Sequence, residues 1–276
     1  MLIRLGHSPD PDDAFMFWAI AAGAVDTRGF EIELIQNDIQ TLNDWALEGK
    51  LEVTAISLHN YAFVQDRYLL LPHGASFGSG YGPVVVSPQP LTKAELLETE
   101  IAVPGARTTA FLVLRMALGA DFPYREVPFE EIIDEVRAGR SPAGLVIHEG
   151  QLTYQRAGLA KSLDLGEWWL LETGLPLPLG VNVAARSLGP ETLSELSEVL
   201  RASIKAGLDN RVDAMAYALQ FARGLDLPTA DRFVAMYVNE LTQDYGEEGR
   251  QAVEELFRRA WALGAFDAPV RVEFVV

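Results

Sequence analysis

The stretch Leu2-Ile3-Arg4-Leu5-Gly6 runs directly into His7-Ser8-Pro9-Asp10-Pro11-Asp12-Asp13. The short aliphatic run predicts a buried strand, because it is bounded by polar turn residues. The aspartates and prolines that follow are typical of a turn and a helix start. The junction therefore predicts a strand, a turn and a helix, the repeating unit of an α/β protein.

The same order continues along the chain. Short β-branched or aliphatic runs alternate with longer amphipathic segments, which predicts βα units on a largely parallel sheet. The predicted strands are 2–6, 30–35, 52–56, 83–86, 100–103, 144–147 and 179–183. The predicted helices are 12–22, 41–48, 58–64, 92–97, 109–118, 130–138 and 151–157. From residue 190 onward we expect successive helices, with one last strand near 270–275.

Two proline-rich segments, Ser87-Pro88-Gln89-Pro90 and Leu175-Pro176-Leu177-Pro178, divide the chain. Such segments are stiff and lack amide donors, so they suit hinges better than central strands. We expect a first domain of 1–88 plus 185–276 and an inserted domain of 89–184. Two α/β lobes with two crossovers predict a periplasmic-binding-protein-like architecture (type II), with ligand in the cleft between the domains.

Charge and composition restrict the partners. The 276 residues include 39 acidic and 22 basic side chains, for a net charge of −17. This surplus repels phosphate backbones and anionic lipids, so neither nucleic acid nor a membrane is an expected partner. There are no cysteines, which excludes thiolate and iron–sulfur chemistry. The first apolar run is too short for a signal peptide, which predicts a cytoplasmic location. The oligomeric state stays open.

Three predicted junctions place hydroxyl groups at helix starts after a strand: 6–13, 54–58 and 103–109. Helix amino termini attract anions through their unpaired N–H groups and the helix dipole. The candidate ligand contacts at these junctions are Ser8, Ser57, Thr108 and Thr109. Asp38, after the second strand, is a candidate for contacting ligand hydroxyls or for capping a helix. Each of these residues could equally be an ordinary N-cap.

The four histidines, His7, His59, His73 and His148, do not have the spacing of a zinc site, so no metal is expected. His148 follows the run 145–147, at the carboxyl end of a predicted strand, where catalytic groups of α/β proteins collect. An imidazole there can titrate near neutrality and act as a general base. The alternative is a structural histidine at a strand end. His7 and His59 could line the same cleft.

Five motifs resemble those of the 1,4-dihydroxy-6-naphthoate synthases, enzymes of the futalosine route to menaquinone that have a periplasmic-binding-protein-like fold. They are Ser8-Pro9-Asp10-Pro11-Asp12-Asp13-Ala14-Phe15, Thr41-Leu42-Asn43-x-Trp45-Ala46-Leu47-Glu48-Gly49, Pro104-Gly105-x-x-Thr108-Thr109-Ala110, Ile147-His148-Glu149 and Thr173-Gly174-Leu175-Pro176-Leu177-Pro178-Leu179-Gly180. Typical members read Ser-Pro-Cys-Pro-Asn-Asp-Thr-Phe in the first motif, where this chain has Asp10, Asp12 and Ala14.

The resemblance implies a carbon–carbon lyase that cleaves cyclic dehypoxanthine futalosine and releases 1,4-dihydroxy-6-naphthoate. His148 would act as the general base, and Ala55, Ile56, Ser57, Thr108 and Thr109 would contact this small anionic precursor of an aromatic product. Formation of an aromatic ring supplies driving force, so no cofactor is expected. The alternatives are a chorismate dehydratase of the same pathway and a non-catalytic solute-binding protein for a small organic anion.

Overall fold

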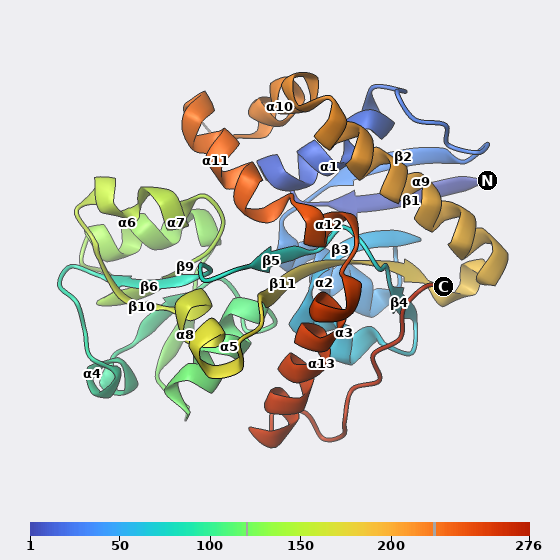
Figure 1. Cartoon of the computed structure of the whole chain (residues 1–276). Helices are drawn as coiled ribbons and strands as arrows, with labels where there is room; N and C mark the ends of the chain where they lie inside the picture. Colours follow the sequence, from blue (N-terminus) through green and yellow to red (C-terminus); the bar gives the residue numbers. More distant parts are fainter. Residues whose placement is uncertain (120, 223–224) are drawn as a thin grey trace. The chain divides into compact units, whose positions relative to one another are not determined.

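The computed structural model describes residues 1–119, 121–222 and 225–276. These residues form two compact units, whose elements are labelled in Figure 1. Unit 1 consists of Met1–Phe77, Gly180–Arg250 and Arg271–Val276, and unit 2 of Gly78–Leu179 and Gln251–Val270.

Unit 1 is built on a sheet with strand order β2-β1-β3-β11-β4, and β5 pairs with β11. The strands are β1 (Leu2–His7), β2 (Glu31–Gln36), β3 (Val53–Ser57), β4 (Tyr68–Leu70), β5 (Ser76–Gly78) and β11 (Leu177–Ala185). β1 is parallel to β2 and β3, whereas β11 is antiparallel to β3 and β4. The chain leaves β1 toward β2 on one side and returns to β3 on the other. The topological switch point therefore lies between β1 and β3.

Helices cover both faces of this sheet. They are α1 (Pro11–Ala21), α2 (Ile39–Glu48), α3 (Leu58–Val64), α9 (Pro190–Asp209), α10 (Arg211–Ala218), α11 (Leu227–Tyr237) and α12 (Glu240–Gln243); α13 (Gly246–Ala262) is shared with unit 2. Figure 1 shows α1, α9 and α10 on one side and α2 and α3 on the other.

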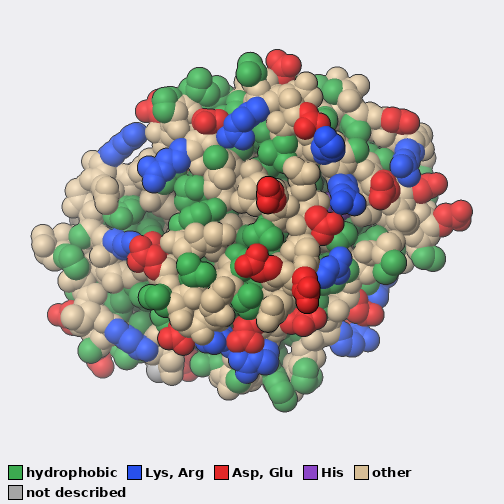
Figure 2. All heavy atoms as spheres, in the orientation of Figure 1, with side chains coloured by type: hydrophobic (Ala, Val, Ile, Leu, Met, Phe, Trp, Pro, Cys, Tyr) green, Lys and Arg blue, Asp and Glu red, His purple; other side chains and the backbone are tan. Residues whose placement is uncertain are grey.

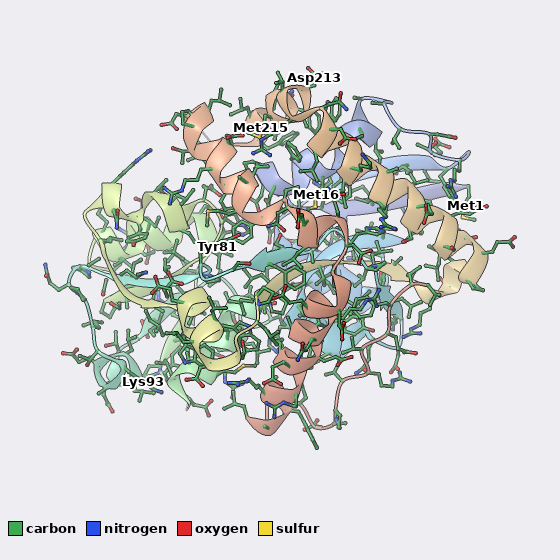
Figure 3. The ribbon with its side chains drawn as sticks, in the orientation of Figure 1. Met1, Met16, Tyr81, Lys93, Asp213 and Met215 are labelled. Atoms are coloured by element: carbon green, nitrogen blue, oxygen red, sulfur yellow. The ribbon has the colours of Figure 1, made fainter. Side chains whose placement is uncertain are left out.

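The main core of unit 1 surrounds α1, which is apolar on all sides because it is enclosed by the sheet, α9 and α10. Met16 of α1 and Met215 of α10, labelled in Figure 3, belong to this core. Close helix contact requires Gly207 of α9, since a Cβ there would lie 3.0 Å from the Phe15 carbonyl oxygen. Each buried Leu, Ile or Phe contributes roughly 1.5–3 kcal/mol relative to an exposed one.

Unit 2 contains a five-stranded sheet with order β10-β6-β9-β7-β8. The strands are β6 (Val84–Ser87), β7 (Ile101–Val103), β8 (Tyr124–Glu126), β9 (Ala143–Val146) and β10 (Ala160–Asp164). β7 is parallel to β8 and β9, and β6 is antiparallel to β9 and β10. The chain runs from β7 to β8 on one side and then to β9 on the other. Unit 2 thus has its own switch point, between β7 and β9.

The helices of unit 2 pack on this sheet around a core that includes Val86, Ala102, Ile132 and Val136. They are α4 (Lys93–Glu98), α5 (Thr109–Leu118), α6 (Ile132–Arg137), α7 (Gly150–Thr153) and α8 (Leu165–Thr173), with 3-10 turns at Phe129–Glu131 and Tyr154–Ala157. The 3-10 turns Arg186–Leu188 and Leu219–Phe221 belong to unit 1. Gly144 in β9 lets α6 approach, because a Cβ there would lie 2.5 Å from the Ile132 Cγ2 atom.

The structure confirms an α/β fold and corrects two expectations. The sheets are mixed rather than largely parallel, because β11 in unit 1 and β6 in unit 2 run against their neighbours. The segment 87–90 lies inside unit 2 at the end of β6, where the Ser87 hydroxyl donates to the Gln89 carbonyl, so it is a surface turn rather than a crossing between units. The units also differ from the predicted domains in assigning Gln251–Val270 to unit 2.

Within the described ranges, no helix combines the length and the apolar character that a membrane crossing needs. On the face shown in Figure 2, Lys and Arg side chains are interspersed with Asp and Glu, and no continuous basic patch is seen.

Candidate active site

In unit 1, the predicted site residues gather at the carboxyl ends of neighbouring strands. Ser8 follows β1 directly, Ser57 is the last residue of β3, and Asp38 comes shortly after β2. The first two therefore flank the switch point, where ligands of open α/β sheets bind.

The position of Ser57 is fixed by Asn43, a fully buried residue of α2. The Ser57 amide N–H donates to Asn43 Oδ1 (2.9 Å), and Asn43 Nδ2 donates to the Ser57 hydroxyl oxygen (3.1 Å). The Asn43 carbonyl accepts a further bond from Asn60 Nδ2 (2.9 Å). Residue-by-residue reasoning missed Asn43, although it lies in the second family-like motif and is a polar residue on the buried face of a helix.

Ala55 and Ile56 extend β3 beyond its ladder with β1. That ladder ends at Thr54, whereas pairing with β11 continues through Ser57. Both side chains are buried. Backbone groups alternate in direction along a strand, so one of these two residues can offer its N–H and C=O on the β1 side, and neither offers a functional side chain.

The turn after β1 is dense in buried polar groups. The Ser8 amide N–H donates to Asp13 Oδ2 and the Ser8 hydroxyl donates to Asp10 Oδ2, both at 2.8 Å. Asp10 stands at the N-cap position of α1, but its side chain makes no capping bond. The turn and helix start expected at these aspartates are present, but the Asp10 carboxylate accepts from Ser8 instead of capping the helix.

His7 is fully buried in this turn rather than exposed at the sheet edge. Its Nδ1 donates to the Ser8 carbonyl (2.8 Å), and its ring lies 5.3 Å from that of Phe17. Burial lowers the pKa of His7 and raises the pKa of Asp13. The imidazole is therefore held neutral, in a structural position.

Asp38 caps α2. Its Oδ1 accepts from the Thr41 amide (3.0 Å) and its Oδ2 from the Thr41 hydroxyl (2.5 Å). This is the capping alternative that the sequence left open, and a capping aspartate stabilises a helix by about 1 kcal/mol. A contact with ligand stays a prediction.

In unit 2, Thr108 and Thr109 stand where the chain passes from β7 into α5. Thr108 is the N-cap, because its hydroxyl accepts from the Phe111 amide (3.2 Å) and donates to the Gly105 carbonyl (2.8 Å). The Thr109 hydroxyl donates to the Leu179 carbonyl (2.7 Å). The first-turn amides of α5, which have no partner within the helix, emerge at the carboxyl end of β7.

His148 stands just beyond the end of β9, on the other side of the same switch point. Its φ of 55° lies in the left-handed region, which among the described non-glycine residues occurs otherwise only at Arg28. Such a conformation costs about 1–3 kcal/mol and is often retained at functional sites.

The half-buried imidazole of His148 packs against Phe129, with ring centroids 4.5 Å apart. The ring contact restricts the orientation of the imidazole. Sequence reasoning did not find Phe129, because no spacing rule connects a residue of the 3-10 turn before α6 to one after β9.

Each unit thus brings its own predicted residues to one edge of one sheet: Ser8, Asp38, Ala55, Ile56 and Ser57 in unit 1, and Thr108, Thr109 and His148 in unit 2. Among the described side chains, no group of three or more His, Cys, Asp or Glu residues could hold a metal ion. The arrangement supplies the backbone amides of helix starts, hydroxyl oxygens and one imidazole, while the hydroxyl protons of Ser8, Thr108 and Thr109 are donated within the protein.

This fold is that of the periplasmic binding proteins. A Candida albicans protein with the generic periplasmic-binding-protein fold superposes with a TM-score of 0.73 at 11% identity, covering 100% of this chain and 98% of its own. A crystal structure of an Archaeoglobus fulgidus protein is more similar still, with a TM-score of 0.91, 45% identity, and coverage of 96% and 98%.

The menaquinone biosynthesis family matches residues 3–262, and the chain belongs to that family. The 1,4-dihydroxy-6-naphthoate synthase of Thermus thermophilus is 41% identical, covering 99% of both chains. The enzyme of that name from Streptomyces coelicolor is 38% identical, covering 96% of this chain and 95% of its own. The family resemblance found in the motifs is therefore confirmed.

Proposed function

We propose that this protein is a 1,4-dihydroxy-6-naphthoate synthase. It would cleave the carbon skeleton of cyclic dehypoxanthine futalosine as a lyase, without a cofactor and with His148 as the general base. Support comes from two relatives named as this enzyme, at 41% and 38% identity over nearly the full chain. The observation that carries the catalytic assignment is the strained backbone of His148 beside the switch point of unit 2.

The geometry suits a base whose direction is fixed. His148 is a left-handed residue two positions after the end of a buried strand, and the Phe129 ring supports one side of its imidazole. His148 is half-buried as a residue and its Nε2 atom is buried, so the ring is shielded from water. A positioned general base typically contributes about 10²–10⁴ in rate.

The neighbouring donors suit the charge of the substrate. In a chain of net charge −17, an anion is better held by amides and hydroxyls than by an acidic surface. The backbone amides at the amino terminus of α5, which begins at Thr109, are such donors, and α5 follows β7, the strand that pairs with β9. They would bind a substrate carboxylate or stabilise an oxyanion that develops during cleavage. Within unit 1, Ser57 and the backbone of Ala55 are the candidate ligand contacts.

The direct test is to incubate the purified protein with cyclic dehypoxanthine futalosine and to detect 1,4-dihydroxy-6-naphthoate by mass spectrometry. A parallel incubation with chorismate checks for dehydratase activity. Binding of the futalosine derivative without any product would instead favour a solute-binding protein. The proposal includes the predicted cytoplasmic location, which cell fractionation would test.

A further inference from the structure

Unit 1 contains a pocket that includes none of the predicted site residues. Its volume is about 220 Å³. One wall is a single face of α9, where Ser194, Ser197, Glu198 and Arg201 recur at helical spacing. The other lining residues are Pro72, His73, Asp244, Arg250, Val275 and Val276. The pocket therefore joins α9 to the loop after β4 and to the C-terminal segment.

Arg250 is the most informative residue of this pocket. Its guanidinium stacks on the Phe274 ring, 4.1 Å from the ring centroid. It forms no ion pair among the described residues, although acidic side chains outnumber basic ones by 39 to 22. An arginine that lies over an aromatic ring keeps its N–H donors available, in the fork geometry that binds an oxyanion through two hydrogen bonds.

Further donors line the same space. Arg201 is paired with Asp244 at 3.3 Å, and the other Asp244 carboxylate oxygen accepts from the Gly246 amide, so this acid is engaged. The Ser197 hydroxyl is hydrogen-bonded to His73 Nε2 (2.9 Å). Burial lowers the pKa of His73 to about 4, so this histidine is neutral near neutral pH and adds no charge.

We propose that this pocket binds a small oxyanion, a carboxylate or a phosphate, with Arg250 as its principal contact and Arg201 and the serine hydroxyls as further donors. The pocket volume is about that occupied by roughly seven molecules of liquid water. It is below the ~300 Å³ of common ligand pockets, so only a small molecule fits. The site is separate from the proposed catalytic residues, and its occupancy does not depend on the proposed enzyme activity.

Such a ligand would connect α9 to the end of the chain. The C-terminal segment already lies along β4, since the Val275 amide donates to the Leu70 carbonyl (2.8 Å) and the Leu70 amide donates to that of Glu273 (3.0 Å). A molecule bound by Arg250 and α9 would hold this segment from its other side. Because it binds the folded state alone, it would raise Tm with ligand concentration.

The test is isothermal titration of the full chain with sodium malonate and, separately, with sodium phosphate, against sodium chloride at equal ionic strength. We expect a Kd on the order of 1 mM for at least one of them, and the preference identifies the oxyanion. Arg250→Gln should raise the Kd about tenfold or more. Arg250→Lys keeps the positive charge but cannot donate two parallel hydrogen bonds, so its Kd should lie between those of wild type and Arg250→Gln. Arg232 is an exposed residue of α11, outside the pocket. Arg232→Gln makes the same change in net charge and should leave the Kd unchanged.

Glu198→Gln decides the sign of the ligand charge. Glu198 lines the pocket and forms no ion pair among the described residues, so removing its charge should strengthen oxyanion binding severalfold. If malonate and phosphate bind Glu198→Gln with a higher Kd than wild type, the pocket selects a cation or a zwitterion, and the proposal is overturned. Binding of neither anion, or equal affinity in Arg250→Gln and wild type, would also overturn it. Should Arg250→Gln fail to fold, Arg250→Lys and Glu198→Gln still carry the test.

Discussion

The side-chain amide of Asn43 hydrogen-bonds Ser57 at both of its ends, accepting from the Ser57 amide at 2.9 Å and donating to the Ser57 hydroxyl oxygen at 3.1 Å. Asn43 is fully buried, and Ser57 is nearly so. The last residue of β3 is thus fixed by a helix that begins elsewhere on the same sheet edge. Ser57 is accordingly a preorganised contact rather than a mobile one.

Asn43→Ala should destabilise unit 1 and weaken substrate binding. The change leaves the Ser57 amide N–H buried without an acceptor, which costs about 1–3 kcal/mol of unfolding free energy. Urea unfolding and KM measure the two effects. Ser57→Ala is the control, because it removes only the hydroxyl and keeps the bond from its N–H to Asn43. If both variants lose the same unfolding free energy, the hydrogen bond from the Ser57 N–H to Asn43 is not what fixes this position.

Thr109→Val should raise KM and slightly lower stability, although it replaces a hydroxyl by a methyl group of similar size. The hydroxyl that it removes donates to the Leu179 carbonyl, so losing this bond should lower the free energy of unfolding by about 0.5–1.5 kcal/mol and loosen the amino terminus of α5, where substrate is proposed to bind. Thr109→Ser keeps the hydroxyl and should behave as wild type in steady-state kinetics. Equal KM values for the valine and serine variants would count against a role for this hydroxyl.

His73 should make the protein acid-sensitive. Burial, followed by the nearby Arg201, lowers its pKa from 6.5 to about 4. In the unfolded chain His73 becomes protonated below about pH 6.5, whereas in the folded chain it stays neutral down to about pH 4. The free energy of unfolding therefore decreases as the pH falls through this window. At pH 5 the loss should be about 2 kcal/mol relative to pH 7.

The matched variant for this effect is His73→Gln, which can still hydrogen-bond Ser197 but does not titrate. Urea unfolding at pH 7 and pH 5 should show a loss of stability that is about 2 kcal/mol larger in wild type than in the variant. Parallel losses in both proteins would mean that His73 is not the acid-sensitive group.

Turnover should survive removal of metal ions. The proposed chemistry uses an imidazole and hydrogen-bond donors, and aromatisation of the product supplies the driving force. Dialysis against EDTA followed by the product assay is the measurement. A loss of activity that a divalent ion restores would refute a cofactor-free reaction.

The elements that position the site were predictable because they are long or buried. The helices 58–64 and 109–118 match α3 and α5, whose starts are marked by Ser57 and Thr108 after aliphatic runs. Three of the strands that were not predicted, β4, β5 and β8, are only three residues long, and the fourth, β10, has five residues that are all half-buried. Such strands exist through pairing with neighbours, and a local pattern does not reveal that pairing.

The chemistry of the candidate site was only partly predictable. A histidine at a strand end can be recognised from sequence, because the aliphatic run before it marks the strand. Its left-handed backbone and its contact with Phe129 depend on how the chain turns after β9. The Asn43 contact with Ser57 likewise joins a helix to a strand, so single-residue capping rules do not show it.

The most direct test of the account is His148→Asn. Asparagine adopts the left-handed conformation more readily than most residues, so the backbone at φ 55° should be retained, while the side chain cannot accept a proton near neutral pH. We predict a fall in kcat of about 10²–10⁴-fold, with Tm and substrate affinity nearly unchanged. A variant that keeps more than about a tenth of wild-type kcat, or that loses activity only in proportion to a lower Tm, would contradict the assignment of His148 as the base.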